Sequence, residues 1–503
     1  MKSDKPLTVY LRPETIPVII IPGIAGSALE PVDHDDRIKN GPGWPVNNTM
    51  QMIKLLVRGP RRKRLNLVGR QHHRPGYLHL QVIGGNDPRA ASGIPGWKKE
   101  EHYGRSNKNG LLGIAALKYR SLVNHLVDRD ALRDDPNKSP GSPLDDWYFR
   151  TPPHGFGYNW TADIRYAGQS LRKFLNDLSE YYRSLHARCD RFILVTHSTG
   201  GLVARAALQQ DPSFASKIVS VYHTGVPHVG AAEAFFRVKA GFPQDTFDEK
   251  KVAWATMRSG KEAAAVFGNL PGALQLLPSN DYRTNDGKPG WLEVRRESKE
   301  GMAVDEYPVV DCYEEIYKLD VVSRGLIDKD LLDPRLSANA EDEFNLYTDR
   351  IDLVEKFHDQ VRGVEYECAR QVVSVGLPTP DKVRLACSDD ENVISAYAST
   401  FHGVKPPHLR RSRGEFTMVG NLDPGSQARW YVELLPRNGE GDATVPQTVA
   451  NGTHTGFEGE TITVENVPHA DMLLDVSCQW KIMKTIEKDL ARLILEHERS
   501  LRY

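Results

Sequence analysis

The stretch Arg191-Phe-Ile-Leu-Val-Thr-His-Ser-Thr-Gly-Gly-Leu-Val-Ala204 decides the fold of this chain. Phe192–Val195 is an apolar run long enough for a buried strand, and Leu202–Leu208 continues as a helix. Ser198 lies in the small-residue turn between them. A serine at the apex of a tight strand-to-helix turn is typical of a nucleophile elbow, which lifts the hydroxyl clear of a sheet. The G-x-S-x-G pattern is met except that Thr196 replaces its first glycine, and S-x-G by itself also arises in ordinary turns.

Apolar runs of strand length recur along the chain and alternate with helical segments. A continuous run such as Ile16–Ile21 is typical of a parallel strand that is buried on both faces. The other predicted strands and the longest flanking helices are Trp147–Phe149, Ile218–Tyr222, Val372–Val375, Thr461–Val464, Tyr166–His186 and Cys478–Leu501. This alternation predicts an α/β fold with a doubly wound, mostly parallel sheet.

The strand rhythm stops between residues 231 and 365, where mixed-polarity helical segments follow one another. We interpret this part as an inserted, largely helical cap. The core then consists of residues 1–230, with an irregular basic excursion at about 33–111, and of residues 366–503. Within the cap, the segment Ala234–Phe267 combines apolar and charged side chains. This pattern predicts either a mobile lid over Ser198 or a permanently packed helix.

Composition excludes several classes of protein. In 503 residues, 65 Lys and Arg balance 66 Asp and Glu, so no overall positive charge favours nucleic acid. The five cysteines are scattered and the histidines lack ligand spacing, so we expect no metal and no cofactor. No apolar run approaches the ~20 residues of a membrane span, and no signal peptide is evident. We therefore expect a cytoplasmic protein, or one exported by a route that needs no signal peptide.

One stretch, Lys54–Arg74, is strongly basic and includes the run Arg61-Arg62-Lys63-Arg64. Basic runs are commonly solvated loops. Clustered Lys and Arg also gain roughly 1 kcal/mol each at an anionic membrane surface. We expect peripheral contact between this stretch and anionic lipid headgroups, with the solvated loop as the alternative.

A serine hydroxyl needs a base within hydrogen-bond reach and a group that orients the base. In α/β-hydrolases these follow the serine in the order acid, then histidine. Asp442, in Gly441-Asp-Ala-Thr-Val-Pro446, and His469, just after the last predicted strand, satisfy that order. Each residue alone is an ordinary loop residue. His228 is a competing base that comes early in the chain, and His197 is expected to point away from the serine.

Several motifs follow one another in the order found in the lecithin:cholesterol acyltransferase family, which this chain resembles. The matching stretches are Pro17–Glu30, Gly157–Trp160, Val195–Gly201, Thr224–Gly230, Asn269–Ser279, Val375–Pro380, Gly441–Pro446 and Val467–Met472. The resemblance implies that Ser198, Asp442 and His469 form a catalytic triad. It also implies that the amides of Ala25 and Thr199 form the oxyanion hole. Thr196 and the missing secretion signal depart from the family pattern.

The resemblance further implies acyl transfer from a lipid ester, such as a phospholipid, through an acyl-enzyme. Whether water or another alcohol accepts the acyl group stays open. The alternative enzyme is a carboxylesterase or thioesterase acting on smaller soluble esters, which predicts a short cap. A non-catalytic binding module is a third possibility, and it predicts a missing triad member, whereas none is missing here.

Overall fold

The computed structural model describes residues 14–27, 29–33, 44, 60–69, 79–82, 122, 126, 149–241, 260–298, 301–320, 324–333, 339–388, 417–421, 429–434, 439–452, 457 and 459–500. None of the helices in these ranges is both long and apolar enough to cross a membrane.

A six-stranded sheet forms the centre of the molecule, in the order β17-β11-β8-β7-β2-β6. Every neighbouring pair of its strands is parallel. The strands are β2 (Val18–Ile21), β6 (Pro153–Gly155), β7 (Phe192–His197), β8 (Ile218–Thr224), β11 (Ala369–Val375) and β17 (Thr461–Glu465). The predicted α/β architecture with a mostly parallel sheet is confirmed, and β7, the strand that precedes Ser198, lies in the interior of the sheet.

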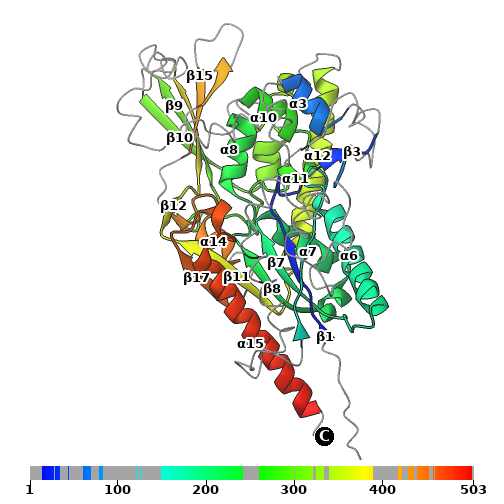
Figure 1. Cartoon of the computed structure of the whole chain (residues 1–503). Helices are drawn as coiled ribbons and strands as arrows, with labels where there is room; N and C mark the ends of the chain where they lie inside the picture. The colour runs from blue at the N-terminus through cyan, green and yellow to red at the C-terminus, as the bar shows by residue number, and fades with distance from the viewer. Residues whose placement is uncertain are drawn as a thin grey trace, which may run out of the picture.

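Helices cover both faces of this sheet (Figure 1). They are α6 (Ile164–Ser184), α7 (Thr199–Gln210) and α15 (Val476–Ser500). In β7, Phe192 and Leu194 join the apolar cluster that contains α6 and α7, whereas Ile193 and Val195 join the cluster that contains α15. Because successive strand side chains point to opposite faces, a run of four apolar residues buries both faces at once.

Short strands and helices complete the part of the chain that the structure describes. The short strand pairs are β1 (Glu14–Thr15) with β5 (Phe149–Arg150), β3 (Leu29–Pro31) with β4 (Leu80–Val82), and β12 (Leu377–Thr379) with β16 (Gly439–Gly441). The helical elements are α3 (Pro60–Leu67), α8 (Ala232–Ala240), α10 (Gly260–Phe267), α11 (Pro271–Leu274), α12 (Ala340–Val361), α14 (Gln447–Ala450), and the short helical segments Pro212–Lys217, Tyr313–Tyr317, Lys329–Leu331 and His469–Asp471.

The insertion at residues 231–365, which was interpreted as largely helical, also contains two strands that the sequence analysis did not predict. It contributes β9 and β10 to a five-stranded sheet in the order β10-β9-β13-β15-β14. Its strands are β9 (Leu292–Ser298), β10 (Gly301–Tyr307), β13 (Val383–Ser388), β14 (Thr417–Asn421) and β15 (Arg429–Leu434). The last three come from the stretch assigned to the core. The buried Leu292 and Val294 alternate with charged neighbours, a period-2 signal that the prediction overlooked.

The part of the predicted lid that lies in α8 is firmly packed. Phe235 and Phe236 are 0% and 1% exposed, and both belong to the main apolar cluster together with Val266 of α10. Such burial favours a fixed cap helix over a mobile lid for α8. Residues 242–259 of the predicted lid lie outside the described residues.

The basic run of α3 is exposed only in part, so two of its four cations do not lie on the surface as expected for a membrane-facing cluster. Arg61 and Arg62 are exposed, but the side chains of Lys63 and Arg64 are 1% exposed. Lys63 Nζ lies 2.7 Å from the carboxylate of Glu262 in α10. Arg64 pairs with two acids of the cap. Its Nη2 is 3.1 Å from Glu343 and its Nη1 is 3.6 Å from Asp333. These two cations therefore hold the cap together, and the rest of Lys54–Arg74 beyond residues 60–69 lies outside the described part.

Removing one member of this buried charge cluster is expected to destabilise the cap strongly. Arg64→Ala removes the guanidinium that faces the buried carboxylates of Asp333 and Glu343, and breaking a buried ion pair typically costs about 3–5 kcal/mol. The exposed Arg61 on the same helix is the matched control, and Arg61→Ala is expected to stay within about 0.5 kcal/mol of the parent. Urea denaturation of the three proteins measures the difference. Equal midpoints for both variants would contradict the assignment.

Candidate active site

Ser198 lies at the sharp turn between β7 and α7. Its backbone has φ 53° and ψ −126°, a left-handed conformation that non-glycine residues rarely adopt. The turn is fixed on both sides, because the Ser198 amide donates to the Thr224 carbonyl and its carbonyl accepts from the Gly201 amide. The strand, the strained apex and the helix match the geometry of a nucleophile elbow. Thr196 in place of glycine has not prevented that geometry.

Asp442 lies in the loop between β16 and α14, with one carboxylate oxygen committed to its own turn. Oδ1 accepts hydrogen bonds from the amides of Thr444 and Val445, at 3.0 and 2.6 Å. The following residue, Ala443, has φ 71° and donates its amide to the Thr379 hydroxyl at 2.9 Å. The local turn therefore orients the carboxylate and leaves Oδ2 to face another partner.

That partner is His469, in the single turn that follows β17. Its Nδ1 lies 2.6 Å from Asp442 Oδ2, and its amide donates to the Asp442 carbonyl at 2.8 Å. Burial by itself lowers the pKa of the imidazole. The charge and hydrogen bond of Asp442, with the charge of Glu233, more than compensate, so the pKa of His469 is raised above its ordinary value. The structure thus brings together the predicted acid and the predicted base.

Two glycines allow the backbone to pass close to this acid–base pair and to the elbow. Gly225, at the end of β8, has φ 58°, and a Cβ there would lie 2.9 Å from Asp442 Oδ2 and 3.1 Å from His469 Nδ1. On the other side, a Cβ on Gly23 would lie 2.9 Å from Ser198 Cβ. His197, next to the serine, donates from Nε2 to the His469 carbonyl at 2.9 Å. Sequence reasoning missed this role of His197 in tying the histidine loop to the elbow.

The two residues expected to form the oxyanion hole have free amides in the part of the chain that the structure describes. Ala25 has φ 60°, and its carbonyl accepts from Trp44 Nε1 at 3.1 Å, which fixes the loop after β2. Thr199 begins α7, where the first amides of a helix have no partner within the helix. A Cβ on Gly23, two residues before Ala25, would lie 2.9 Å from Ser198 Cβ, so the loop that carries Ala25 passes close to the serine.

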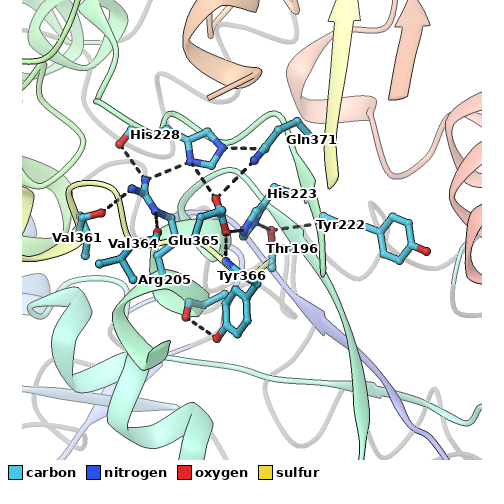
Figure 2. Close-up of polar contacts among 11 residues, drawn as sticks. Thr196, Arg205, Tyr222, His223, His228, Val361, Val364, Glu365, Tyr366 and Gln371 are labelled. Carbon is cyan, nitrogen blue, oxygen red and sulfur yellow. Dashed lines mark hydrogen bonds and ion pairs between the residues drawn. The ribbon is translucent and has the colours of Figure 1, made fainter. Parts of the chain in front are cut away.

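A buried polar network lies beneath the elbow (Figure 2). Thr196 of β7 donates its hydroxyl to His223 Nδ1 at 2.9 Å, and His223 Nε2 donates to the carboxylate of Glu365 at 3.0 Å. Although burial opposes ionisation, the charges and hydrogen bond of its neighbours lower the pKa of Glu365 to about 2. The residue that breaks the glycine pattern is therefore the one that joins the nucleophile strand to this network.

Arg205 connects the same network to the end of the cap. From α7 its guanidinium donates to the carbonyls of Val361 and Val364, at 2.6 and 2.8 Å, and to the ring and carbonyl of His228. Val361 is the last residue of α12, so Arg205 caps a helix whose unpaired carbonyls favour a cation. The elbow helix and the cap helix are thus fixed to one another.

His228, the competing base, is not at the reacting centre. Its Nδ1 accepts from Arg205 Nη1 at 3.1 Å, and its Nε2 donates to Gln371 at 2.8 Å. Burial, followed by the charge of Arg205, lowers the pKa of His228 to about 3. Both ring nitrogens of His228 form hydrogen bonds inside the fold, which leaves His469 as the base candidate.

In the described ranges, no cluster of three or more His, Cys, Asp or Glu side chains is arranged to hold a metal ion.

The architecture is that of an α/β-hydrolase fold. A solved structure titled as the Tle4–Tli4 complex matches with a TM-score of 0.66 at 19% identity, over 95% of this chain and 99% of that one. Two others, Bacillus licheniformis lipase BlEst2 and phospholipase PlaB from Legionella pneumophila, match with TM-scores of 0.16 and 0.18 at 17% and 10% identity. They cover 28% and 69% of this chain, and 57% and 90% of their own. No protein-family model and no curated protein matches the sequence.

Replacing Asp442 tests the acid–base pair through the pH dependence of ester hydrolysis. A general base works only when unprotonated, so a raised pKa of His469 places the acidic limb of kcat/KM above the pH usual for histidine. Asp442→Asn removes the main cause of that rise. We expect the limb to move to lower pH and kcat to fall by up to ~10⁴-fold. The control, Glu440→Gln on the exposed side of β16, should keep the parental profile. An unmoved limb in Asp442→Asn would refute the pairing.

Substitutions of Thr196 test how much its hydrogen bond to His223 contributes to the stability of the fold. Thr196→Val keeps the shape but leaves His223 Nδ1 without its donor, and an unsatisfied buried acceptor costs about 1–3 kcal/mol. Thr196→Ser keeps the hydroxyl and is expected to recover most of that loss. The free energies of unfolding, from urea titration, decide the point. If the valine variant were as stable as the parent, the Thr196–His223 bond would contribute nothing.

Proposed function

We propose that this chain is a serine-dependent acyl-ester hydrolase or acyltransferase acting on lipid esters, most simply a phospholipase or lipase. The observation that carries the proposal is the Asp442–His469 contact of 2.6 Å beside a serine held at positive φ. A histidine oriented by a carboxylate next to a serine at the apex of a tight turn is the arrangement that activates a hydroxyl for attack on an ester.

In the proposed mechanism, His469 accepts the proton of the Ser198 hydroxyl as the hydroxyl attacks the ester carbonyl. Asp442 holds the imidazole through Nδ1 and stabilises its protonated form. The amides of Ala25 and Thr199 donate to the oxygen of the tetrahedral intermediate. His469 then protonates the leaving alcohol, and water or another alcohol releases the acyl group from Ser198. In the apo protein Ser198 and His469 need not be hydrogen-bonded, because such contacts often tighten only when substrate binds.

The lipid character of the substrate is supported by the sequence resemblance to the lecithin:cholesterol acyltransferase family and by the large cap. A carboxylesterase or thioesterase for small soluble esters stays the alternative. The site geometry is the same for both, so the distinction depends on which ester the protein turns over.

Labelling and product analysis test the proposal together. A fluorophosphonate probe is expected to modify the protein once, on the peptide that carries Ser198, and Ser198→Ala is expected to abolish the label. The matched control is Ser216→Ala, at an exposed serine that follows α7. Mass spectrometry of mixed phospholipids should show released fatty acid or a new acyl ester with the parent and not with Ser198→Ala.

Two results contradict parts of this proposal. Labelling that survives Ser198→Ala refutes the nucleophile. Turnover of a short soluble ester without any attack on phospholipid or triacylglycerol, by protein that labels normally, refutes the lipid substrate and favours the soluble esterase.

A further inference from the structure

Glu233, in the first turn of α8, has a carboxylate that the protein satisfies only in part. The residue is 7% exposed. Its Oε1 accepts a hydrogen bond from Arg237, one turn further along the helix. Its Oε2 is buried and has no hydrogen-bond partner among the described residues. Buried polar atoms in folded proteins are almost always hydrogen-bonded, so this oxygen indicates a partner that the described polypeptide does not supply.

The chain places Glu233 close to the reacting centre. The turn that leads from β8 to α8 begins at Gly225, which lies against Asp442 and His469. The charge of Glu233 is also one of the causes that raise the pKa of His469. β8 pairs with β7, the strand that ends just before Ser198, so the turn that carries Glu233 leaves the sheet at the same edge as the serine. A second buried atom without a partner, the hydroxyl oxygen of Thr199, follows the serine directly.

The chemistry of a lipid ester limits which of its groups can donate a hydrogen bond to Glu233 Oε2. A carboxylate oxygen accepts hydrogen bonds and attracts positive charge. The acyl chain of a lipid offers neither, and its phosphate is itself an anionic acceptor. Only the alcohol side of a phospholipid carries donors, either a protonated amine or hydroxyl groups. A metal ion is a poorer match, since the described residues place no second and third ligand around Glu233.

We propose that Glu233 Oε2 accepts a hydrogen bond from a protonated amine or a hydroxyl in the headgroup of a phospholipid substrate. Glu233 is then a specificity-determining residue, and it selects headgroups that carry an N–H or O–H over those that carry none. This inference rests on the proposed lipid hydrolysis. It goes beyond that proposal by naming the class of headgroup and the side chain that binds it.

The test compares three phospholipids with identical acyl chains in the same detergent micelles. Phosphatidylethanolamine offers an ammonium donor, phosphatidylglycerol offers hydroxyl donors, and phosphatidylcholine offers neither. Fatty acid release at a pH well above the pKa of His469 gives kcat/KM for each lipid. For the parent we expect at least one donor headgroup to exceed phosphatidylcholine by about tenfold or more, as a hydrogen bond to a charged group typically provides. The favoured lipid tells whether ammonium or hydroxyl is the ligand.

Glu233→Gln is the deciding variant. It keeps the side-chain shape and an oxygen for Arg237, but it replaces one acceptor oxygen by an amide nitrogen that donates. We expect the ratio of the favoured lipid to phosphatidylcholine to fall toward one. The matched control is Glu341→Gln, which removes an exposed carboxylate in the first turn of the cap helix α12 and should keep the parental ratio.

Three outcomes overturn the proposal. They are a parental enzyme that turns over all three lipids equally, an unchanged ratio in Glu233→Gln, and an equal loss on all three lipids. The last result would mean that Glu233 acts through His469 and not on the headgroup. Failure of the parent to attack any phospholipid would refute the lipid substrate as well, so the two failures are distinguishable.

Discussion

The structure depends on one strained residue, Ser198, whose positive φ is imposed by everything around it. Such a backbone is unfavourable for a residue with a side chain, and it persists only where the surroundings over-determine it. Here β7 is fixed inside a parallel sheet, and α7 packs against α6 on one face of that sheet. The positions of this strand and this helix therefore constrain the backbone of the short turn that joins them. The Ser198 hydroxyl is therefore positioned by the sheet itself, and the loops that carry Asp442 and His469 lie at the same turn.

The polar network beneath the elbow explains how the cap is held in a fixed position relative to the turn at Ser198. Arg205 belongs to the elbow helix, yet three of its donors reach carbonyls and a ring that belong to the end of α12 and to the β8–α8 turn. Glu365 balances this buried guanidinium and, through His223, holds Thr196. A buried charge needs such partners, because desolvation is not otherwise compensated. The same logic applies in the cap, where Lys63 and Arg64 are neutralised by acids from α10, α12 and the segment between them.

Local signals in the sequence were sufficient for the core and for the order of the site residues. Strands that are buried on both faces read as continuous apolar runs, so β2, β7 and β8 were predicted close to their true positions. The five-stranded sheet was missed because its strands lack the continuous apolar runs of the central sheet and come from two separate stretches of the chain. The burial of Lys63 and Arg64 in α3 was missed for a related reason. A charged residue is taken for a solvent-exposed one when the sequence does not reveal its ion-pair partners. The partners of Arg64 lie about 270 residues further along the chain.

The sequence by itself determined the α/β core, the small-residue turn at Ser198 and the identity of Asp442 and His469 as candidates, because these depend on periodicity and on short motifs. Only the tertiary structure decided which groups meet. It brought His469 Nδ1 to Asp442 Oδ2, assigned His228 to Arg205 and Gln371, and gave Thr196 and His197 their partners. It also left one oxygen of Glu233 buried without a partner among the described residues. Such facts arise from distances between residues far apart in the chain, and local pattern carries no information about those distances.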